Sequence, residues 1–295
     1  MGAANMEFID AHLHFGGRED EILGCQDIYV KLKTLGLRKV YLLCFTTFGL
    51  DFSDTIRVTP YHVRSHYHPD FVDSNPLLQK VREELESEDF IVPFLDFRII
   101  HGDVESWLEH YMPFGYQGLK TLFIPEYDDF LQVESPADIL KTTKSSYLDW
   151  QQRVMDYGRQ NSLPLICHLN LHNHFEYATE FLSNFPNLQI NFPHLGFSRK
   201  KMSQLLDKFS NCYSDISGLY DHIEKDPKSY CDYLEHYKER VMFGSDCAWN
   251  EAKKTEGYLR LVEGLPLNPG CRRKLLYDVA SKFLGEENQG ANPKI

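Results

Sequence analysis

Several features that would place a chain in a common class of protein are missing from this sequence. The apolar runs all fall short of the ~18 residues that a membrane-spanning helix needs, so no membrane span is expected. The N-terminus has no basic segment followed by an apolar one, which argues against a secretory signal. The sequence G-x-S-x-G is also missing, so no Ser-His-Asp hydrolase arrangement is indicated.

Basic residues are too few and too scattered for a nucleic-acid-binding protein. The formal net charge is −12, and Lys and Arg form no block of the kind that follows a line of phosphates. We therefore expect a small-molecule substrate rather than a nucleic acid or a membrane surface as the partner. Base rates for soluble enzymes favour a homodimer.

Paired cysteines are missing too. The seven cysteines form no Cys-x-x-Cys pair, and their number is odd. Several lie inside apolar runs such as YLLCF and LICHL, where a reduced thiol behaves as a small apolar side chain. This pattern favours a reducing compartment, and we expect a cytoplasmic protein.

What the sequence does contain is a regular alternation of short apolar runs with longer amphipathic segments. The runs favour β-strands, and they are apolar throughout rather than at every second position, which is typical of parallel strands buried on both faces. Eight such runs are found, at 7–12, 39–45, 89–97, 117–124, 163–169, 188–195, 212–217 and 240–245.

Eight strand–helix steps predict an α/β fold, a single (β/α)₈ TIM barrel. The alternative, a doubly wound open sheet, would need a glycine-rich turn after the first strand, and HLHFGG matches that pattern poorly. Barrels of about 250 residues routinely form one unit. With no linker or repeat in the sequence, we expect residues 1–295 to form one domain, with the barrel core at about 7–285.

One predicted connection, residues 46–75 between the second and third strands, is unusually long and has little helical pattern. A loop of this length in a compact domain is usually functional or disordered, and its tyrosines, histidines and arginines argue against disorder. In a barrel it would emerge at the C-terminal face, where active sites lie.

Four imidazoles and one carboxylate close predicted strands. The first strand ends in a His-x-His pair whose two rings share one face of the strand. In a barrel, side chains at these positions reach the mouth, and imidazole with carboxylate is the ligand chemistry of Zn²⁺ and similar ions. We therefore predict a divalent metal site from the residues His12, His14, His168, His194 and Asp246.

The order of these motifs resembles that of the amidohydrolase superfamily. The segments FIDAHLHFG, GLK, ICHLN, FPHLG, SDISG and VMFGSDCAW carry the resemblance, which spans residues 8 to about 250. They are most similar to the amidohydrolase-2 branch, which includes aminocarboxymuconate-semialdehyde decarboxylase and its relatives. The resemblance implies a distorted (β/α)₈ barrel that holds one or two divalent metals.

Carried over to this chain, the resemblance makes His12, His14, His168 and Asp246 metal ligands, with His194 and Asp246 as catalytic residues. It implies one metal, for which Zn²⁺ is the expected ion, although the same groups would hold Mn²⁺. In binuclear relatives a carbamylated lysine bridges two metals. Lys120 lies on the matching strand, but the amidohydrolase-2 branch is mostly mononuclear, so a second metal is not expected.

Substrate-binding residues are harder to predict. Lys120 could hold a substrate carboxylate, and Arg64 on the long loop and Arg98 after the third strand could clamp one through a bidentate fork. For either arginine, a place on a solvated loop is the alternative. Trp249 either walls the pocket or packs against it.

Two reactions fit these residues. The first is hydrolysis of a lactone, amide or related carbonyl compound by a metal-activated water, with His194 stabilising the oxyanion and Asp246 passing a proton to the leaving group. The alternative is non-oxidative decarboxylation of a small unsaturated or aromatic acid. The chain is short for that group and lacks the glutamate that some aromatic-acid decarboxylases have at the first histidine of His-x-His, which favours hydrolysis. A catalytically silent barrel is disfavoured because no ligand is lost.

Overall fold

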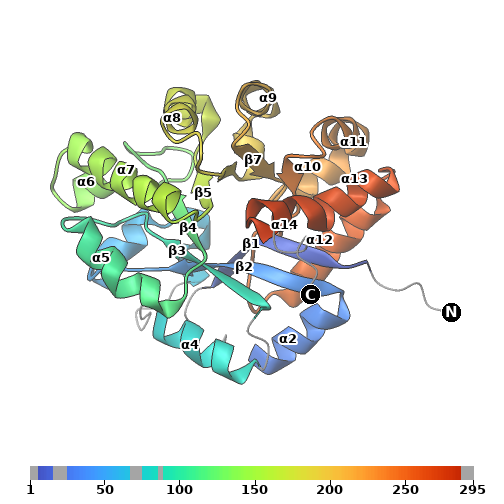
Figure 1. The fold of residues 1–295 in the computed structure, drawn as a ribbon, viewed down its shortest axis with the longest axis horizontal. Helices are drawn as coiled ribbons and strands as arrows, with labels where there is room; N and C mark the ends of the chain where they lie inside the picture. Colours follow the sequence, from blue (N-terminus) through green and yellow to red (C-terminus); the bar gives the residue numbers. More distant parts are fainter. Residues whose placement is uncertain (1–5, 16–24, 67–74, 86–88, 287–295) are drawn as a thin grey trace, which may run out of the picture.

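The computed structural model describes residues 6–15, 25–66, 75–85 and 89–286. Its centre is one parallel sheet with the strand order β8-β7-β6-β5-β4-β3-β2-β1-β9. Helices lie between the strands and surround them (Figure 1). The strands are Phe8–Phe15 (β1), Leu37–Phe45 (β2), Ile91–Asp96 (β3), Gly118–Leu122 (β4), Leu165–His168 (β5), Ile190–Phe192 (β6), Cys212–Asp215 (β7), Val241–Met242 (β8) and Cys247–Ala248 (β9). This is a distorted (β/α)₈ barrel, as predicted.

The helices follow the strands in the order that a barrel requires. They are Cys25–Thr34 (α2), Phe52–Thr55 (α3), Asn75–Glu84 (α4), Val104–Tyr111 (α5), Pro136–Ile139 (α6), Lys144–Gln160 (α7), Leu171–Asn184 (α8), Arg199–Lys208 (α9), Tyr220–Lys225 (α10), Pro227–His236 (α11), Ala252–Gly264 (α12), Pro269–Arg273 (α13) and Val279–Phe283 (α14). Short 3₁₀ segments lie at Ile56–Val58 (η1), Tyr61–His66 (η2), Met112–Phe114 (η3) and His194–Phe197 (η4), and a π-helical turn at Lys274–Asp278 (η5).

The predicted eighth strand, 240–245, is the one that differs most from expectation, because only Val241–Met242 of it form a strand and a second short strand, β9, follows after Asp246. β8 pairs with β7, whereas β9 pairs with β1 on the other side of the break. Between them the backbone leaves the regular ladder: the N–H of Ala11 donates to the carbonyl of Phe243 at 3.0 Å, and Asp246 has a left-handed φ of 60°. The break directs the side chain of Asp246 toward His12 and His14. The two short strands still connect β7 with β1 and so link the two sides of the barrel.

The barrel interior is an apolar cluster that the strands share with the C-terminal helix. Ile9 and Ala11 of β1 belong to it, and α14 contributes Phe283, whose ring lies 6.5 Å from that of Tyr41. Larger apolar residues on the outward faces of the strands pack against the helices. The interior is thus filled below the mouth, which leaves the C-terminal ends of the strands for the polar residues.

A register shift in β1 decides which face the two histidines share. After a first irregularity between Phe8 and Ile9, Asp10 pairs with Val40 and the next paired residue, Leu13, with Leu42, so one residue of β1 is left over between them. Such a bulge changes the phase of alternation and re-aims the side chains that follow. As a result Ala11 and His12 both turn inward, while Leu13 packs in the outer core.

The described part of the long predicted loop is ordered by polar contacts to the segment after β4. Arg57 donates to both carboxylate oxygens of Glu134, at 2.9 and 2.5 Å. The backbone N–H of Tyr61 donates to the carbonyl of Leu131 at 3.0 Å. The two segments therefore lie together at the C-terminal face of the barrel, and residues 67–74 of the loop lie outside the described residues.

Among the helices in the described ranges, none has both the length and the apolar character that a membrane span needs.

Candidate metal centre

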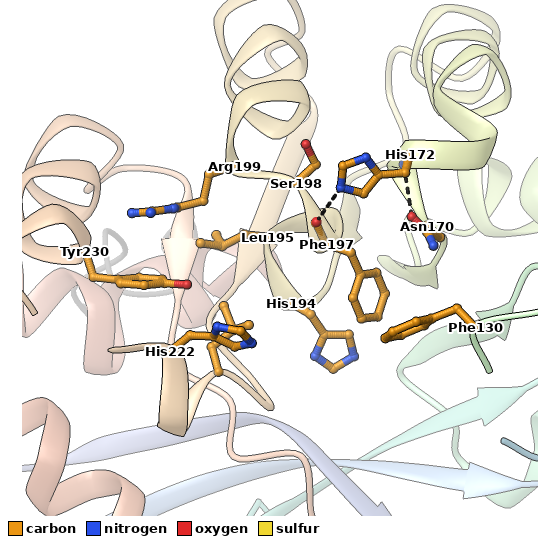
Figure 2. Close-up of a pocket in the computed structure, with 11 residues that line it drawn as sticks. Phe130, Asn170, His172, His194, Leu195, Phe197, Ser198, Arg199, His222 and Tyr230 are labelled. Carbon is orange, nitrogen blue, oxygen red and sulfur yellow. Dashed lines mark hydrogen bonds between the residues drawn. The ribbon is translucent and has the colours of Figure 1, made fainter. Parts of the chain in front are cut away.

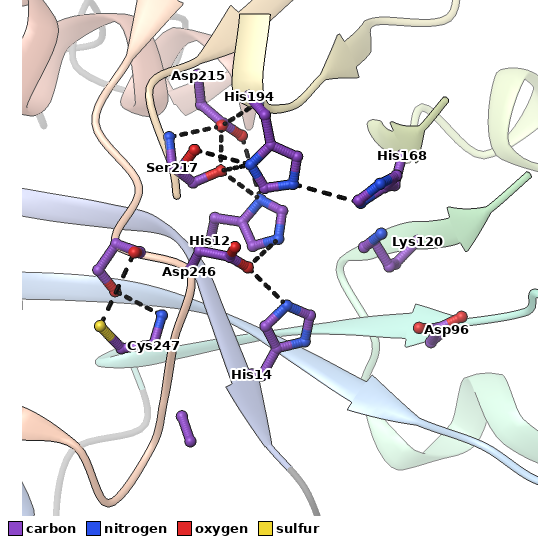
Figure 3. Close-up of polar contacts among 12 residues, drawn as sticks. His12, His14, Asp96, Lys120, His168, His194, Asp215, Ser217, Asp246 and Cys247 are labelled. Atoms are coloured by element: carbon purple, nitrogen blue, oxygen red, sulfur yellow. Dashed lines mark hydrogen bonds and ion pairs between the residues drawn. The ribbon is translucent and has the colours of Figure 1, made fainter. Parts of the chain in front are cut away.

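Three of the predicted ligands meet at the mouth of the barrel (Figure 3). The Nε2 atom of His14 lies 3.1 Å from Oδ1 of Asp246, and Nε2 of His12 lies 3.4 Å from the same oxygen. The ligand atoms of these three residues all lie within 4.8 Å of one another. Two imidazoles and a carboxylate at this spacing form a site that can hold a divalent metal.

Unsatisfied nitrogen atoms support the same conclusion. Among the described residues, Nε2 of His12 and Nε2 of His168 are buried and have no hydrogen-bond partner. Leaving a buried polar atom unpaired costs about 1–3 kcal/mol, so such atoms usually have a partner. A metal ion would use both lone pairs, and the residues present therefore fit the predicted group.

His168 lies beside the three-residue cluster rather than inside it. Its Nδ1 is 3.3 Å from Nε2 of His194, and the two ring centres are 4.8 Å apart. His168 ends β5 and His194 follows β6, and these two strands are neighbours in the sheet. The structure thus brings all five predicted residues to one region, with His168 and His194 as a pair at its edge.

A buried carboxylate that the sequence analysis did not assign holds this arrangement together. Asp215, at the end of β7, accepts hydrogen bonds from Nδ1 of His12 at 3.3 Å and from the backbone N–H of His194 at 3.1 Å. It also accepts from Nδ2 of Asn191 at 2.7 Å and from the N–H of Ser217 at 3.0 Å. One carboxylate therefore orients both histidines.

The contact with Asp215 also fixes the chemical form of His12. A proton on Nδ1 leaves the lone pair of Nε2 free for a metal, the usual arrangement of a ligating histidine with a carboxylate behind it. Burial lowers the pKa of His12 to about 4, so the ring is neutral at pH 7. Burial alone would raise the pKa of Asp215, but the hydrogen bonds from His12 and Ser217 hold it below its ordinary range.

Asp215→Asn should therefore weaken metal binding without removing a ligand. We expect a 10- to 100-fold loss of affinity, the usual effect of removing an outer partner of a ligating histidine. Equilibrium dialysis with Zn²⁺ and Mn²⁺ measures it, and Asp156→Asn on the exposed face of α7 is the matched control. Unchanged affinity in Asp215→Asn would show that His12 needs no carboxylate behind it.

His194 is held in an unusual backbone conformation. Its φ is 58°, Leu195 follows with 50°, and Nδ1 of His194 lies 2.7 Å from the carbonyl of Ser217. A proton on Nδ1 would be donated there, leaving Nε2 as an acceptor toward the mouth. Gly218 (φ 65°) makes room, since a Cβ there would lie 2.9 Å from Oδ2 of Asp246. Left-handed residues of this kind cluster at functional sites.

Lys120 lies in the barrel wall near the cluster, with its side chain 1% exposed. Nζ donates to the carbonyl of Thr121 at 3.0 Å, and Figure 3 shows the amine between His168 and Asp96. Burial lowers the pKa of Lys120 to about 8, partly offset by the charge of Asp96. Its bridging or substrate-binding role stays a prediction.

The buried amine makes a pH-dependent stability test possible. Between pH 8 and 10.5 the amine of Lys120 is protonated in the unfolded chain and neutral in the folded chain. The free energy of unfolding therefore rises with pH across this range, and the buried amine destabilises the fold most below pH 8. A pKa lowered from 10.5 to about 8 corresponds to about 3 kcal/mol. Lys120→Met should raise the free energy of unfolding by up to that amount at pH 7 and by less at pH 10, measured in urea. An equal gain at both pH values would contradict this.

The two predicted arginine clamps are engaged elsewhere. Arg98 forms a buried ion pair with Asp96, Nε to Oδ1 at 3.1 Å and Nη2 to Oδ2 at 2.5 Å, and its guanidinium lies 4.7 Å from the ring centre of Phe45. Arg64 donates to the carbonyls of Thr59 and Gln132 at 2.9 and 2.7 Å. The structure thus uses both side chains to hold loops, and it does not bring either to the metal cluster.

Trp249 also lies away from the cluster. It is 0% exposed, and its ring centre is 6.5 Å from that of Phe90 in the outer core. Its backbone N–H donates to the carbonyl of His14 at 2.8 Å. The residue therefore helps to hold β9 against β1, and the packing alternative is the one that matches its position.

A pocket of about 400 Å³ opens next to His194 (Figure 2). It lies between the segment after β6 and the helices α8, α10 and α11, and the sequence analysis assigned none of its residues except His194. It is lined by Phe130, Asn170, His172, His194, Leu195, Phe197, Ser198, Arg199, Leu219, His222 and Tyr230. Arg199 lies shortly after the FPHLG motif, and this nearness to a predicted site residue was the feature of the sequence that could have pointed to it.

Comparisons with known proteins agree with the fold. Residues 153–285 match the family model described as Amidohydrolase. An uncharacterised TIM-barrel protein from Bordetella bronchiseptica is 12% identical, with a TM-score of 0.60 over 96% of this chain and 100% of that one. No curated protein matches the chain.

Two enzymes of known structure share the fold. A dihydroxybenzoic acid decarboxylase from Polaromonas, solved with bound manganese and the inhibitor 2-nitroresorcinol, is 11% identical, with a TM-score of 0.57 over 95% of this chain and 97% of that one. The 4-oxalomesaconate hydratase of Rhodopseudomonas palustris is 12% identical, with a TM-score of 0.56 over 96% and 97%. These structures support the fold, and the family match over residues 153–285 agrees with the resemblance to the amidohydrolase family that the sequence motifs indicate.

Proposed function

We propose that the protein is a metal-dependent hydrolase that acts on a small carbonyl substrate such as a lactone or an amide. The observation that carries the proposal is the pair of buried Nε2 atoms, on His12 and His168, that lack hydrogen-bond partners beside the carboxylate of Asp246. His12, His14, His168 and Asp246 would hold one divalent ion. Zn²⁺ suits these donors, and Mn²⁺, which the Polaromonas decarboxylase binds, suits them as well.

When bound, the ion would supply Lewis acidity toward a carbonyl oxygen and ease the ionisation of water. Asp246 would take the proton of the attacking water at a carboxylate oxygen and pass it to the leaving group. His194, held through Nδ1 by the carbonyl of Ser217, would stabilise the developing oxyanion when its ring is protonated on both nitrogens, because Nε2 is then a donor as well. Asp215 orients His12 and His194 for these tasks.

The second candidate, non-oxidative decarboxylation, has one observation in its favour. Lys120 is a buried amine near the cluster, and its one hydrogen bond in the described structure is to a backbone carbonyl. A substrate carboxylate would be a stronger partner for it. In this reaction His194 would deliver a proton to the carbon that loses CO₂.

Products distinguish the two reactions. The metal-loaded protein would be incubated with dihydrocoumarin, as a lactone, and with 2,6-dihydroxybenzoate, while acid release and CO₂ release are followed in parallel. Metal-dependent acid release that His194→Ala removes supports hydrolysis. CO₂ release without lactone opening would replace hydrolysis with decarboxylation.

A further inference from the structure

The pocket beside His194 has a cation, Arg199, that has no anionic partner among the described residues. Arg199 is half-buried; its Nη1 donates to Oγ of Ser229 at 2.7 Å, and its guanidinium lies 4.3 Å from the ring centre of Tyr230. Both contacts are to uncharged groups. Asp226, the acidic residue near Tyr230, is engaged at the start of α11, where it accepts from the N–H of Ser229 at 3.3 Å.

Tyr230 adds a hydrogen-bond donor to the same wall. The residue is 7% exposed, and its hydroxyl has no hydrogen bond within the described ranges. Figure 2 shows this hydroxyl directed toward the middle of the pocket, with His222 between Tyr230 and His194 in that view. A hydroxyl that faces a pocket and has no partner in the described ranges is available to a ligand.

The other polar groups of the pocket are already used. Oδ1 of Asn170 caps α8 by accepting from the N–H of His172 at 2.9 Å, and Nε2 of His172 lies 3.0 Å from the carbonyl of Phe197. Oγ of Ser198 accepts from the N–H of Lys201 at the start of α9. What remains is a set of donors, from Arg199, Tyr230 and His222, with no acidic side chain among the lining residues.

The remaining walls are flat and apolar. Phe197 lies 5.2 Å from the ring centres of both His168 and His194, and 5.8 Å from that of Phe130. Phe130 is 70% exposed, which leaves a large aromatic ring in water at the entrance. A planar ligand between these rings would cover that surface and reach from His194 to Arg199.

We propose that this pocket binds a carboxylate that the substrate carries at the end opposite its reacting carbonyl. The substrate would be a planar, unsaturated or aromatic acid, with its carbonyl at the metal centre and its distal carboxylate on Arg199, Tyr230 and His222. A guanidinium and a phenol hydroxyl match the two oxygens of a carboxylate. The assignment rests on the proposed function and specifies the substrate class of that site.

Calorimetric titration of the metal-loaded full chain tests the assignment. The probes are benzoate, which has one carboxylate, and isophthalate and terephthalate, which each have two. Whichever of isophthalate and terephthalate binds more tightly should bind at least about tenfold more tightly than benzoate, because its second carboxylate adds one charge-assisted contact. Arg199→Gln and Tyr230→Phe should each reduce that preference while metal content stays unchanged.

Matched variants keep the test decisive. Tyr230→Phe keeps the ring on which Arg199 stacks, so it reports on the hydroxyl even if Arg199→Gln disturbs the contact with α11. Arg159→Gln, an exposed substitution on α7, should leave the preference intact. Equal affinity for benzoate and both dicarboxylates, or a preference that survives in both pocket variants, would overturn the assignment. Failure of the wild-type protein to bind metal would instead overturn the proposed function.

Discussion

Asp246→Asn should lower the affinity for Zn²⁺ or Mn²⁺ by at least about 100-fold, more than the loss of an outer partner such as Asp215. The carboxylate lies within 3.1 and 3.4 Å of the Nε2 atoms of His14 and His12, and it is the one anionic ligand among the four predicted. A neutral amide would coordinate more weakly and could not accept the proton of water. We therefore expect turnover to fall below detection as well.

Asparagine is the informative replacement at this position because of the backbone. Asp246 has a φ of 60°, and asparagine is among the few residues that tolerate the left-handed region. The variant should therefore fold, and a loss of metal would report on the ligand alone. Metal retained after dialysis is measured by elemental analysis beside Asp156→Asn as the control. Full retention by Asp246→Asn would remove Asp246 from the ligand set.

Arg98→Met should lower the free energy of unfolding by about 3–5 kcal/mol, the typical result of removing one partner of a buried ion pair. The side chains of Arg98 and Asp96 are 6% and 2% exposed, so the variant leaves a carboxylate buried without its main partner. The nearby amine of Lys120 compensates in part, which favours the lower end of the range. The effect would measure what the ion pair of Arg98 with Asp96 contributes to stability.

Urea unfolding of the metal-free protein measures this effect without a contribution from metal binding. The double variant Asp96→Asn/Arg98→Met should recover most of the loss, since no unpaired charge remains. Arg159→Gln removes an exposed ion pair with Asp156 and should change stability by less than about 1 kcal/mol. A change that small in Arg98→Met would contradict a structural role for the pair.

The sequence predicted the barrel well because its strands are buried on both faces. Continuous apolar runs mark such strands plainly, and all eight predicted runs contain strand residues in the structure. The strand-end polar residues could be found for the same reason: a histidine or an aspartate that closes an apolar run is conspicuous. His12, His14 and Asp246 do meet at the mouth.

The backbone irregularities could not be predicted from the residue pattern. The bulge in β1, the split between β8 and β9, and the left-handed turn at His194 all depend on tertiary contacts. Asp215 lies inside SDISG, a motif that the sequence analysis noted, but its role depends on residues of two distant strands. Nothing local marks that convergence.

The arginines show that sequence position also suggests binding roles for residues that the fold uses elsewhere. Sequence position gives Arg64 and Arg98 the right chemistry for a carboxylate clamp, but each finds a partner within the fold. Arg199 donates to the hydroxyl of Ser229, has no anionic partner among the described residues, and lines the pocket. Which cation is left for a ligand depends on where the carboxylates of the fold lie, and a single sequence does not show this.

The central claim, a metal site built from His12, His14, His168 and Asp246, is tested most directly by metal stoichiometry. The purified chain would be stripped with a chelator, dialysed against Zn²⁺ or Mn²⁺ and analysed for bound metal. We predict one equivalent per chain, unchanged in Lys120→Ala and lost in Asp246→Asn. No bound metal under either condition would contradict the account, and the unpaired nitrogens of His12 and His168 would then need another explanation.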